Sequence, residues 1–248
     1  MKLLNAIRMG GAEILPIVEG GKGVSISTGL SSGNWAAAGG VGTFSAVNAD
    51  SFDEQLLKNL DYRAPEVLAA ALAAVLPAPA ASLDVLDAGC GTGLCAPLLR
   101  PYARQLAGVD LSGGMVRKAR QRGGYDTLEV AELTAYLQQQ CQAWDVVLSA
   151  DTLVYFGELG VVLAAAHGAL RPGGWVAFSL EMEEGEEDRA TLTASGRYRH
   201  SHCHVVHALE QAGFHDIRIT EDSLRKEFGV PVRSWVVLAR RGDGPQGA

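Results

Sequence analysis

The sequence predicts an α/β protein whose parallel sheet is covered by helices on both faces. Short apolar runs alternate with helical patterns from about residue 84 to residue 180, and a glycine-rich turn joins the first apolar run to the helix after it. Apolar residues make up 48% of the 248 positions, which is enough to bury a full core. Because strands and helices alternate strictly along the chain, we expect right-handed crossovers between neighbouring parallel strands.

The expected elements follow from periodicity and from helix stop signals. An alanine-rich helix over 64–76 has Pro65 in its first turn. Strands are predicted over 84–87, 105–110, 127–131, 144–150 and 175–180, and helices over 95–103, 114–120, 133–139, 158–170 and 202–212. The turn 170–174 contains two glycines and is expected to end a helix before a strand. Strands over 216–220 and 232–239 have no long crossover between them, which predicts an antiparallel final strand.

Composition excludes several classes of partner and ligand. A net charge of -7 argues against nucleic acid, whose phosphates need clustered cations, and no apolar run is long enough to span a membrane. The four cysteines show no zinc-like pairing, so free thiols and a cytoplasmic location are expected. The histidines at 200, 202, 204 and 207 have helical spacing, but no carboxylate or second cysteine completes a metal site, so no metal is expected.

Three segments are expected: a glycine-rich extension over 1–50, a main domain over 51–241, and a disordered tail over 242–248. The extension contains extended runs at 14–18 and 24–27 and resembles the beginning of nitronate monooxygenase-like flavin oxidoreductases. That family folds as a (β/α)₈ barrel, and the later strands of such a barrel are absent here. We therefore expect a fused fragment that is partly disordered or packed as an extension.

The glycine turn is the strongest functional signal. Gly89, Gly91 and Gly93 alternate after a strand that ends near Asp87, so bare backbone and a helix N-terminus face a ligand. The glycines alone also satisfy a loose dinucleotide pattern. Asp87 separates the two interpretations, because a carboxylate favours a cationic ligand and not a pyrophosphate.

Further acids end the next strands. Asp110 closes an apolar strand 21 positions after Gly89, where a carboxylate reaches ribose hydroxyls in nucleotide-binding sheets. Glu132 and Leu133 follow the third strand, where they can meet an adenine, although Asp110 and Glu132 can equally cap helices. Asp151 follows the fourth strand and faces the same crevice, with the ring of Tyr155 one turn further on.

Residues from about 52 to 241 resemble the class I S-adenosylmethionine-dependent methyltransferases, and most nearly the predicted methyltransferases associated with tetratricopeptide repeats. The resemblance is carried by several motifs in the family's order: Phe52-Asp53, Tyr62-Arg63-Ala64-Pro65, the turn 87–95, Gly108 to Ser112, Val130 to Leu133, Ala150-Asp151, Leu153 to Tyr155, Ala169 to Gly174 and Gly196 to Tyr198. It implies a Rossmann-like fold with a seven-stranded, mostly parallel sheet and S-adenosylmethionine as cofactor. The cofactor-binding residues it implies are Arg63, Asp87, Gly89, Cys90, Gly91, Gly93, Asp110, Leu111, Glu132, Leu133, Ala150 and Asp151.

The resemblance breaks at the N-terminal side of the domain. Relatives carry an aromatic residue in the segment that leads into Phe52, whereas this chain has Asn48 there. Because that segment helps to close over the cofactor, its replacement predicts an open site with weakened binding or turnover.

The expected reaction is methyl transfer to a small-molecule acceptor, which requires alignment, exclusion of water and, for a hydroxyl, removal of a proton. Tyr155, Tyr198 and His200 are the candidate catalytic residues, and Arg197 and Tyr198 the candidate substrate contacts. A loop followed by a helix cap at Ser201 accounts for the same stretch without a substrate role. A cofactor-binding protein without activity and a nicotinamide or flavin oxidoreductase are the alternatives, and the oligomeric state is left open.

Overall fold

The computed structural model describes residues 7–9, 12–14, 61–193, 195–227 and 229–243. The chain divides into two compact units, 1–52 and 53–248, which are described separately. In the first unit, β1 (Ile7–Met9) and β2 (Ala12–Ile14) pair as an antiparallel hairpin. Several expected features lie outside the described residues: most of the extended runs over 14–27, the position of Asn48, the Phe52-Asp53 motif and the end of the C-terminal tail.

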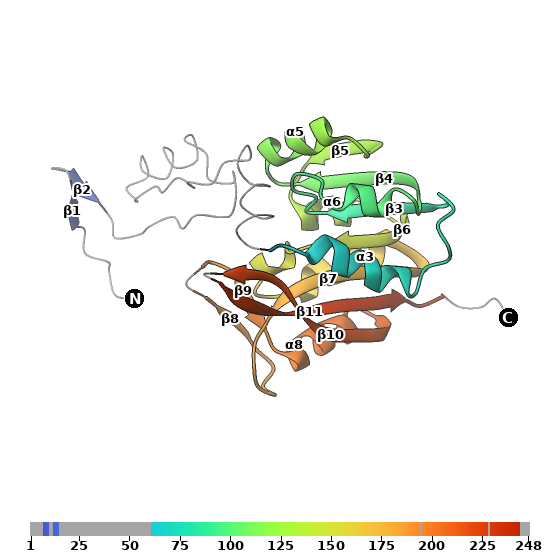
Figure 1. Cartoon of the computed structure of the whole chain (residues 1–248). Coiled ribbons are helices and arrows are strands. Elements are labelled where there is room, and N and C mark those ends of the chain that lie inside the picture. Colours follow the sequence, from blue (N-terminus) through green and yellow to red (C-terminus); the bar gives the residue numbers. More distant parts are fainter. Residues whose placement is uncertain (1–6, 10–11, 15–60, 194, 228, 244–248) are drawn as a thin grey trace. The chain divides into compact units, whose positions relative to one another are not determined.

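The second unit is built on a mixed sheet in the order β10-β11-β7-β6-β3-β4-β5, which Figure 1 shows between β5 at one edge and β10 at the other. Its strands are β3 (Leu83–Ala88), β4 (Ala103–Asp110), β5 (Thr127–Val130), β6 (Trp144–Ser149), β7 (Leu170–Met182), β10 (Phe214–Glu227) and β11 (Val230–Arg241). The strand β11 is antiparallel to both of its neighbours, and the other pairs on this path are parallel. The predicted seven-stranded, mostly parallel sheet with an antiparallel C-terminal strand is therefore confirmed.

Helices lie between the strands, as the alternation predicts. They are α3 (Ala64–Ala73), α4 (Ala96–Leu99), α5 (Gly113–Arg122), α6 (Leu133–Gln138), α7 (Gly160–Ala169) and α8 (His202–Gln211). Helix α7 packs against α6 and α8, while α3 contacts α4 and crosses β7, β10 and β11. The central strands are buried along nearly their whole length, as expected for a parallel sheet covered on both faces.

Several boundaries differ from the prediction, and two of the differences have a clear local cause. Helix α4 ends at Leu99 and not at 103, because Pro101 has no N–H to continue it and Tyr102 closes a turn on the Leu99 carbonyl before β4 begins. The expected turn at 170–174 is a bulge inside β7, where the pairing with β6 jumps from Leu170 to Trp175. Gly173 has a φ of 80° in this bulge, so a glycine is still required.

A small addition at the carboxyl end of β7 was not predicted. The strands β8 (Ala190–Leu192) and β9 (Tyr198–His200) form a hairpin, and β9 runs parallel to the last residues of β7. A 3₁₀ turn, η2 (Leu153–Tyr155), follows β6 and contacts both β7 and β9. These pieces are too short for a periodic pattern to show in the sequence.

The order of the strands in the sheet indicates where the candidate site lies. Strand β3 lies between β4 and β6, so the chain leaves it first toward β4 and β5 and later returns on its other side with β6. Ligands of open α/β sheets bind outside the carboxyl ends of the strands at such a reversal point. The glycine turn, Asp110 and Asp151 all follow strands that end there.

Candidate cofactor site

The glycine turn after β3 is held against the end of β4. Gly89, Gly91 and Gly93 have φ values of 83°, 53° and 87°, which L-residues rarely adopt. The backbone N–H groups of Gly89 and Cys90 both donate to the carbonyl of Val109, at 2.8 and 2.9 Å. The predicted strand, tight turn and helix are therefore present, with the turn anchored to the neighbouring strand.

The glycines of this turn serve different purposes. A Cβ at Gly89 would lie 2.1 Å from Thr152 Oγ1, so this glycine is required by packing against the segment after β6. A Cβ at Gly91 would meet no described atom within 4 Å. The open side of Gly91 is thus the part of the turn against which a ligand can lie.

Asp110 joins the end of β4 to the turn. Its Oδ2 atom accepts from the backbone N–H of Gly91 at 2.9 Å, and its Oδ1 atom accepts from the N–H of Ser112 at 2.8 Å. Burial raises the pKa of Asp110, and the two backbone hydrogen bonds partly offset that rise. Each carboxylate oxygen keeps acceptor capacity for a second donor, so a ribose hydroxyl can be bound without loss of these contacts.

Asp87 is buried beneath the turn with no exposed surface. Its Oδ2 atom accepts a 2.6 Å hydrogen bond from the hydroxyl of Tyr125, and its Oδ1 atom has no partner among the described residues. Burial raises the pKa of Asp87 to about 7 against the lowering effect of the Tyr125 hydroxyl, and the charge of Asp110 raises it further. A carboxylate left half-satisfied in this way is stabilised by a nearby cation, which fits a ligand that carries positive charge.

Glu132, which follows the third strand and is predicted to contact an adenine, caps a helix in the structure. Both carboxylate oxygens of Glu132 accept from backbone N–H groups at the start of α6, those of Thr134 at 2.9 Å and Ala135 at 2.7 Å. Partial burial favours a higher pKa for Glu132, but these hydrogen bonds outweigh it and hold the pKa below its ordinary value. The capping alternative is realised, and contact with an adenine stays a prediction.

Apolar side chains frame the space beside Asp110. Leu111 and Val130, at the ends of β4 and β5, are 53% and 54% exposed although both are large and apolar. Exposed side chains of this kind at the carboxyl edge of a sheet are suited to press on a flat apolar ring. Leu133, predicted for that purpose, is instead buried in the main core.

The segment after β6 carries an ionic network that the sequence analysis missed. Asp151 has a φ of 56° and accepts from the guanidinium of Arg225 on β10. The same guanidinium binds Glu181, at the end of β7, which also accepts from Arg197. Glu181 and Arg225 are both almost fully buried.

The missed residues lie far from their partners in sequence. Arg225 is 74 positions from Asp151, and Tyr125 is 38 positions from Asp87. Neither lies in a motif of recognisable spacing. The only available signal was that an arginine and a tyrosine occur within segments otherwise predicted as connections.

The candidate catalytic residues and the candidate substrate contact Arg197 have different surroundings in the structure. Tyr155 on η2 is 43% exposed beside this network, and burial together with the charge of Asp151 raises its pKa against the opposing effect of Arg197 and Arg225. The ring of Tyr198 packs over Gly157, where a Cβ would approach it to 2.8 Å. The guanidinium of Arg197 is already engaged with Glu181 and is not an uncommitted anchor for an anion.

His200 has no exposed surface, and its Nε2 atom lies 2.8 Å from the carbonyl of Phe156 just after η2. Burial lowers the pKa of His200 to about 4, and the hydrogen bond to Phe156 only partly opposes this shift. A neutral Nε2–H imidazole therefore donates to the Phe156 carbonyl at neutral pH. This geometry favours a supporting role for His200 over the predicted role of general base.

His204 and His207 are engaged with a loop carboxylate. Asp188 accepts from the Nδ1 atoms of His204 and His207 at 2.8 and 2.7 Å. No group of three or more metal-ligating side chains occurs in the described part of the chain. The predicted helix cap at Ser201 is present, because its hydroxyl accepts from the N–H of His204.

Two residues of the N-terminal motif, Tyr62 and Arg63, lie just before α3. Tyr62 is buried, and burial together with the charges of Asp151, Cys95 and Asp87 raises its pKa while Arg225 opposes the rise, so the phenol is neutral. Arg63 is exposed, and its backbone N–H donates to the carbonyl of Leu224 at 2.8 Å. This contact ties the start of α3 to β10 directly beside Arg225.

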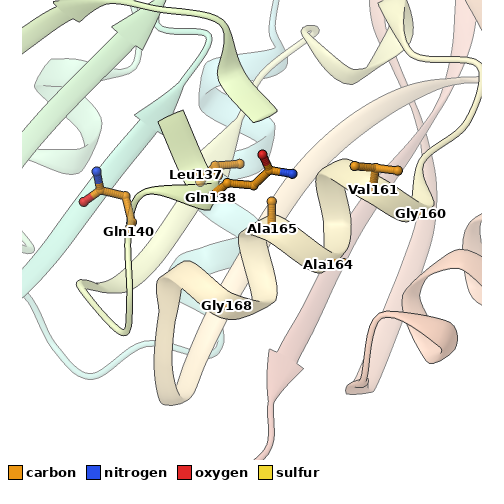
Figure 2. Close-up of a pocket in the computed structure, with 8 residues that line it drawn as sticks. All are labelled: Leu137, Gln138, Gln140, Gly160, Val161, Ala164, Ala165 and Gly168. Atoms are coloured by element: carbon orange, nitrogen blue, oxygen red, sulfur yellow. The ribbon is translucent and has the colours of Figure 1, made fainter. Parts of the chain in front are cut away.

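A groove among the described residues lies away from this site. It has a volume of about 610 Å³ and is formed by α6, α7 and the turn after α6 (Figure 2). Its lining residues are Leu137, Gln138, Gln140, Gly160, Val161, Ala164, Ala165 and Gly168. None of them is ionisable and none belongs to the glycine turn, so the candidate site is not in this groove.

None of the helices that the structure describes combines the length and hydropathy needed to cross a bilayer.

Comparisons with known proteins identify the family of the chain. The family described as a methyltransferase domain matches residues 56–218. Malonyl-[acyl-carrier protein] O-methyltransferase of Acetivibrio thermocellus is 36% identical over 100 residues, which cover 39% of this chain and 35% of that protein. A ubiquinone biosynthesis O-methyltransferase of Thiobacillus denitrificans is 32% identical over 106 residues, which cover 41% of this chain and 46% of that protein. The chain thus matches less than half the length of these two relatives.

A crystal structure of an S-adenosylmethionine-dependent methyltransferase from Mesorhizobium loti aligns with a TM-score of 0.53 and 25% identity. The alignment covers 69% of this chain and 96% of that one. The chain belongs to the methyltransferase domain family, with the Rossmann-like class I fold.

Proposed function

We propose that this chain binds S-adenosylmethionine at the carboxyl ends of β3 and β4 and transfers its methyl group to a small-molecule acceptor. One observation carries the proposal: Asp110 is bonded to the N–H of Gly91, while a second carboxylate, Asp87, lies beneath the same turn with an unpaired oxygen. Two acids around bare backbone suit a ribose and a cationic amino acid group. They disfavour the pyrophosphate of a dinucleotide, because like charges repel.

Each residue of the proposed site has its own role in cofactor binding or in methyl transfer. Asp110 orients the ribose, Asp87 supplies negative charge beneath the amino acid portion, and Leu111 with Val130 faces the base. The bound cofactor supplies an activated methyl group, so the protein has to align the acceptor and exclude water. Asp151, held by Arg225, fixes the segment that carries Tyr155 beside the place of transfer.

The acceptor is proposed to be a small molecule with an oxygen nucleophile. Both sequence relatives are O-methyltransferases by name, one of them acting on malonyl-[acyl-carrier protein]. The raised pKa of Tyr155 makes it an orienting hydroxyl at neutral pH and a poor base. A carboxylate acceptor needs no base, so it fits this site better than an alcohol.

Native mass spectrometry of the purified chain, followed by calorimetry with S-adenosylmethionine, S-adenosylhomocysteine and NAD, tests the cofactor. We expect saturable binding of the first two compounds and none of NAD. Retention of NAD together with no response to millimolar S-adenosylmethionine would contradict the proposal. An Asp110→Ala variant that keeps its fold but binds neither adenosyl compound serves as the matched negative.

Turnover is tested separately with cofactor that carries a deuterated methyl group, incubated with a pool of small carboxylic acids and phenols. Appearance of a labelled ester or ether supports catalysis. Binding without transfer to any pool would favour the alternative of a cofactor-binding protein without activity. The association with tetratricopeptide repeats and the oxidoreductase-like stretch in residues 1–50 stay predictions, and no observation on the described residues favours an oxidoreductase.

A further inference from the structure

We propose that Tyr125 is a positioning residue of the cofactor site, whose hydroxyl holds the buried carboxylate of Asp87 in its ionised, cation-attracting form beneath the glycine turn. The inference rests on the proposed function, because it assigns the residue that prepares the site for a cationic ligand. Tyr125 itself belongs to none of the motifs that carry the family resemblance. It lies in the connection between α5 and β5.

The contact is direct and short. The Tyr125 hydroxyl donates to Asp87 Oδ2 at 2.6 Å, which is in the range of hydrogen bonds from a hydroxyl to a charged oxygen. Asp87 is fully buried, so water cannot replace this donor if it is lost. This hydrogen bond therefore satisfies Oδ2 of the carboxylate, whereas Oδ1 has no partner among the described residues.

Two missing side chains make room for the tyrosine ring. A Cβ at Gly93 would lie 3.0 Å from Tyr125 Cε2, and a Cβ at Gly108 would lie 3.0 Å from Tyr125 Cε1. Gly93 belongs to the cofactor turn, whereas Gly108 is inside β4. The ring is thus packed between the turn and the neighbouring strand, so the hydroxyl has a fixed position with respect to Asp87.

No other described titratable group favours the ionised form of Asp87. The titratable groups around it are the hydroxyls of Tyr125 and Tyr62, the carboxylate of Asp110, and the thiols of Cys90 and Cys95. None of these carries a positive charge, and Asp110 opposes ionisation of Asp87. Among the described residues, the Tyr125 hydroxyl is the one that favours the charged form. A bound ammonium or sulfonium would add the missing positive charge.

A pH series of calorimetric titrations with S-adenosylhomocysteine and S-adenosylmethionine, on the full chain, tests this role. For the wild type, affinity should rise with pH through a midpoint near 7, where Asp87 ionises. In Tyr125→Phe, the ring remains but the donor is lost, so the midpoint should rise by about one unit. Binding should then be about fivefold weaker at pH 7 and unchanged near pH 9.5. A merely structural role would weaken binding equally at every pH.

Tyr102→Phe is the matched control, because Tyr102 precedes β4 at the end opposite to Asp110. It should leave the midpoint where it is. Asp87→Asn should abolish the pH dependence of binding, and Tyr125→Phe made in that background should produce no further shift of a midpoint. An equal midpoint in wild type and Tyr125→Phe overturns the inference.

A second measurement does not depend on the cofactor. Carbon-13 NMR of the aspartate carboxyl groups, with Asp87 assigned from the Asp87→Asn spectrum, follows its titration directly in the free protein. A higher midpoint in Tyr125→Phe supports the inference even if neither adenosyl compound binds, in which case only the proposed function fails. An unchanged carboxyl titration overturns the inference whether or not the cofactor binds.

Discussion

The N–H of Gly91 lies 2.9 Å from Asp110 Oδ2, so the residue that ends β4 fixes the turn that follows β3. The two residues are 19 positions apart, and the hydrogen bond spans adjacent strands of the sheet. It links the turn directly to the carboxylate that is proposed to bind the ribose. A substitution at either residue therefore acts on both binding and local structure, and the two effects have to be measured separately.

Gly91→Ala should lower the affinity for S-adenosylmethionine at least tenfold while the protein stays folded. The added Cβ meets no described atom within 4 Å, so it occupies only the open side of the turn. The left-handed backbone costs about 1–2 kcal/mol of stability in the variant. Gly123→Ala is the matched control, because Gly123 has a φ of 81° and equally open space at the end of α5. Equal losses of affinity in both variants would contradict this prediction.

Asp110→Asn should weaken cofactor binding by about 1–3 kcal/mol, which is roughly five- to 150-fold. An amide has one acceptor oxygen, so it cannot serve both the Gly91 and the Ser112 N–H groups and a ribose hydroxyl as well. Calorimetry with S-adenosylhomocysteine measures the affinity, and urea denaturation measures the fold. The exposed Asp216→Asn variant should bind like the wild type. Undiminished affinity in Asp110→Asn would remove this residue from the site.

Arg225→Met should destabilise the protein by about 3–5 kcal/mol, because it leaves the carboxylates of Asp151 and Glu181 without their shared buried cation. Arg233→Met provides the comparison, since Arg233 also binds two carboxylates, Glu221 and Glu184, but at a half-exposed position. The exposed pairs should contribute no more than about 1 kcal/mol. Denaturant unfolding of both variants at pH 7.5 gives the two values. Similar losses would mean that the network around Glu181 is solvated.

His200 should make the wild type lose stability as the pH falls below about 6.5. Its folded-state pKa of about 4 lies below the ordinary 6.5, so the unfolded chain takes up the proton first and is favoured in acid. Titration of His200 should lower the free energy of unfolding at pH 5 by about 2 kcal/mol, compared with the value above pH 7. The His200→Gln variant should not show this loss of stability in acid. The His202→Gln variant, changed at an exposed position, should show it as the wild type does. Parallel stability profiles for wild type and His200→Gln would show that His200 titrates normally.

The turn and the sheet were predictable because their signals are local. Alternating apolar runs and helical patterns imply parallel strands joined by crossovers, and the spacing from Gly89 to Asp110 is that of one such unit. The boundaries were less predictable: the bulge in β7 looks like a helix-ending turn in sequence, since both need a glycine with positive φ. Likewise, Glu132 could be read as a cap or as a ligand from its position alone.

By itself, the sequence determined that this protein has a glycine turn flanked by acids on a parallel sheet, because strand alternation, turn chemistry and short spacings are properties of neighbouring residues. Only the tertiary structure decided that Tyr125 satisfies Asp87, that Arg225 binds both Asp151 and Glu181, and that His200 is buried. These contacts join residues between 38 and 74 positions apart, and no periodic pattern encodes them. They arise when the sheet brings the carboxyl ends of separate strands together and excludes water, so that each buried charge requires a specific partner.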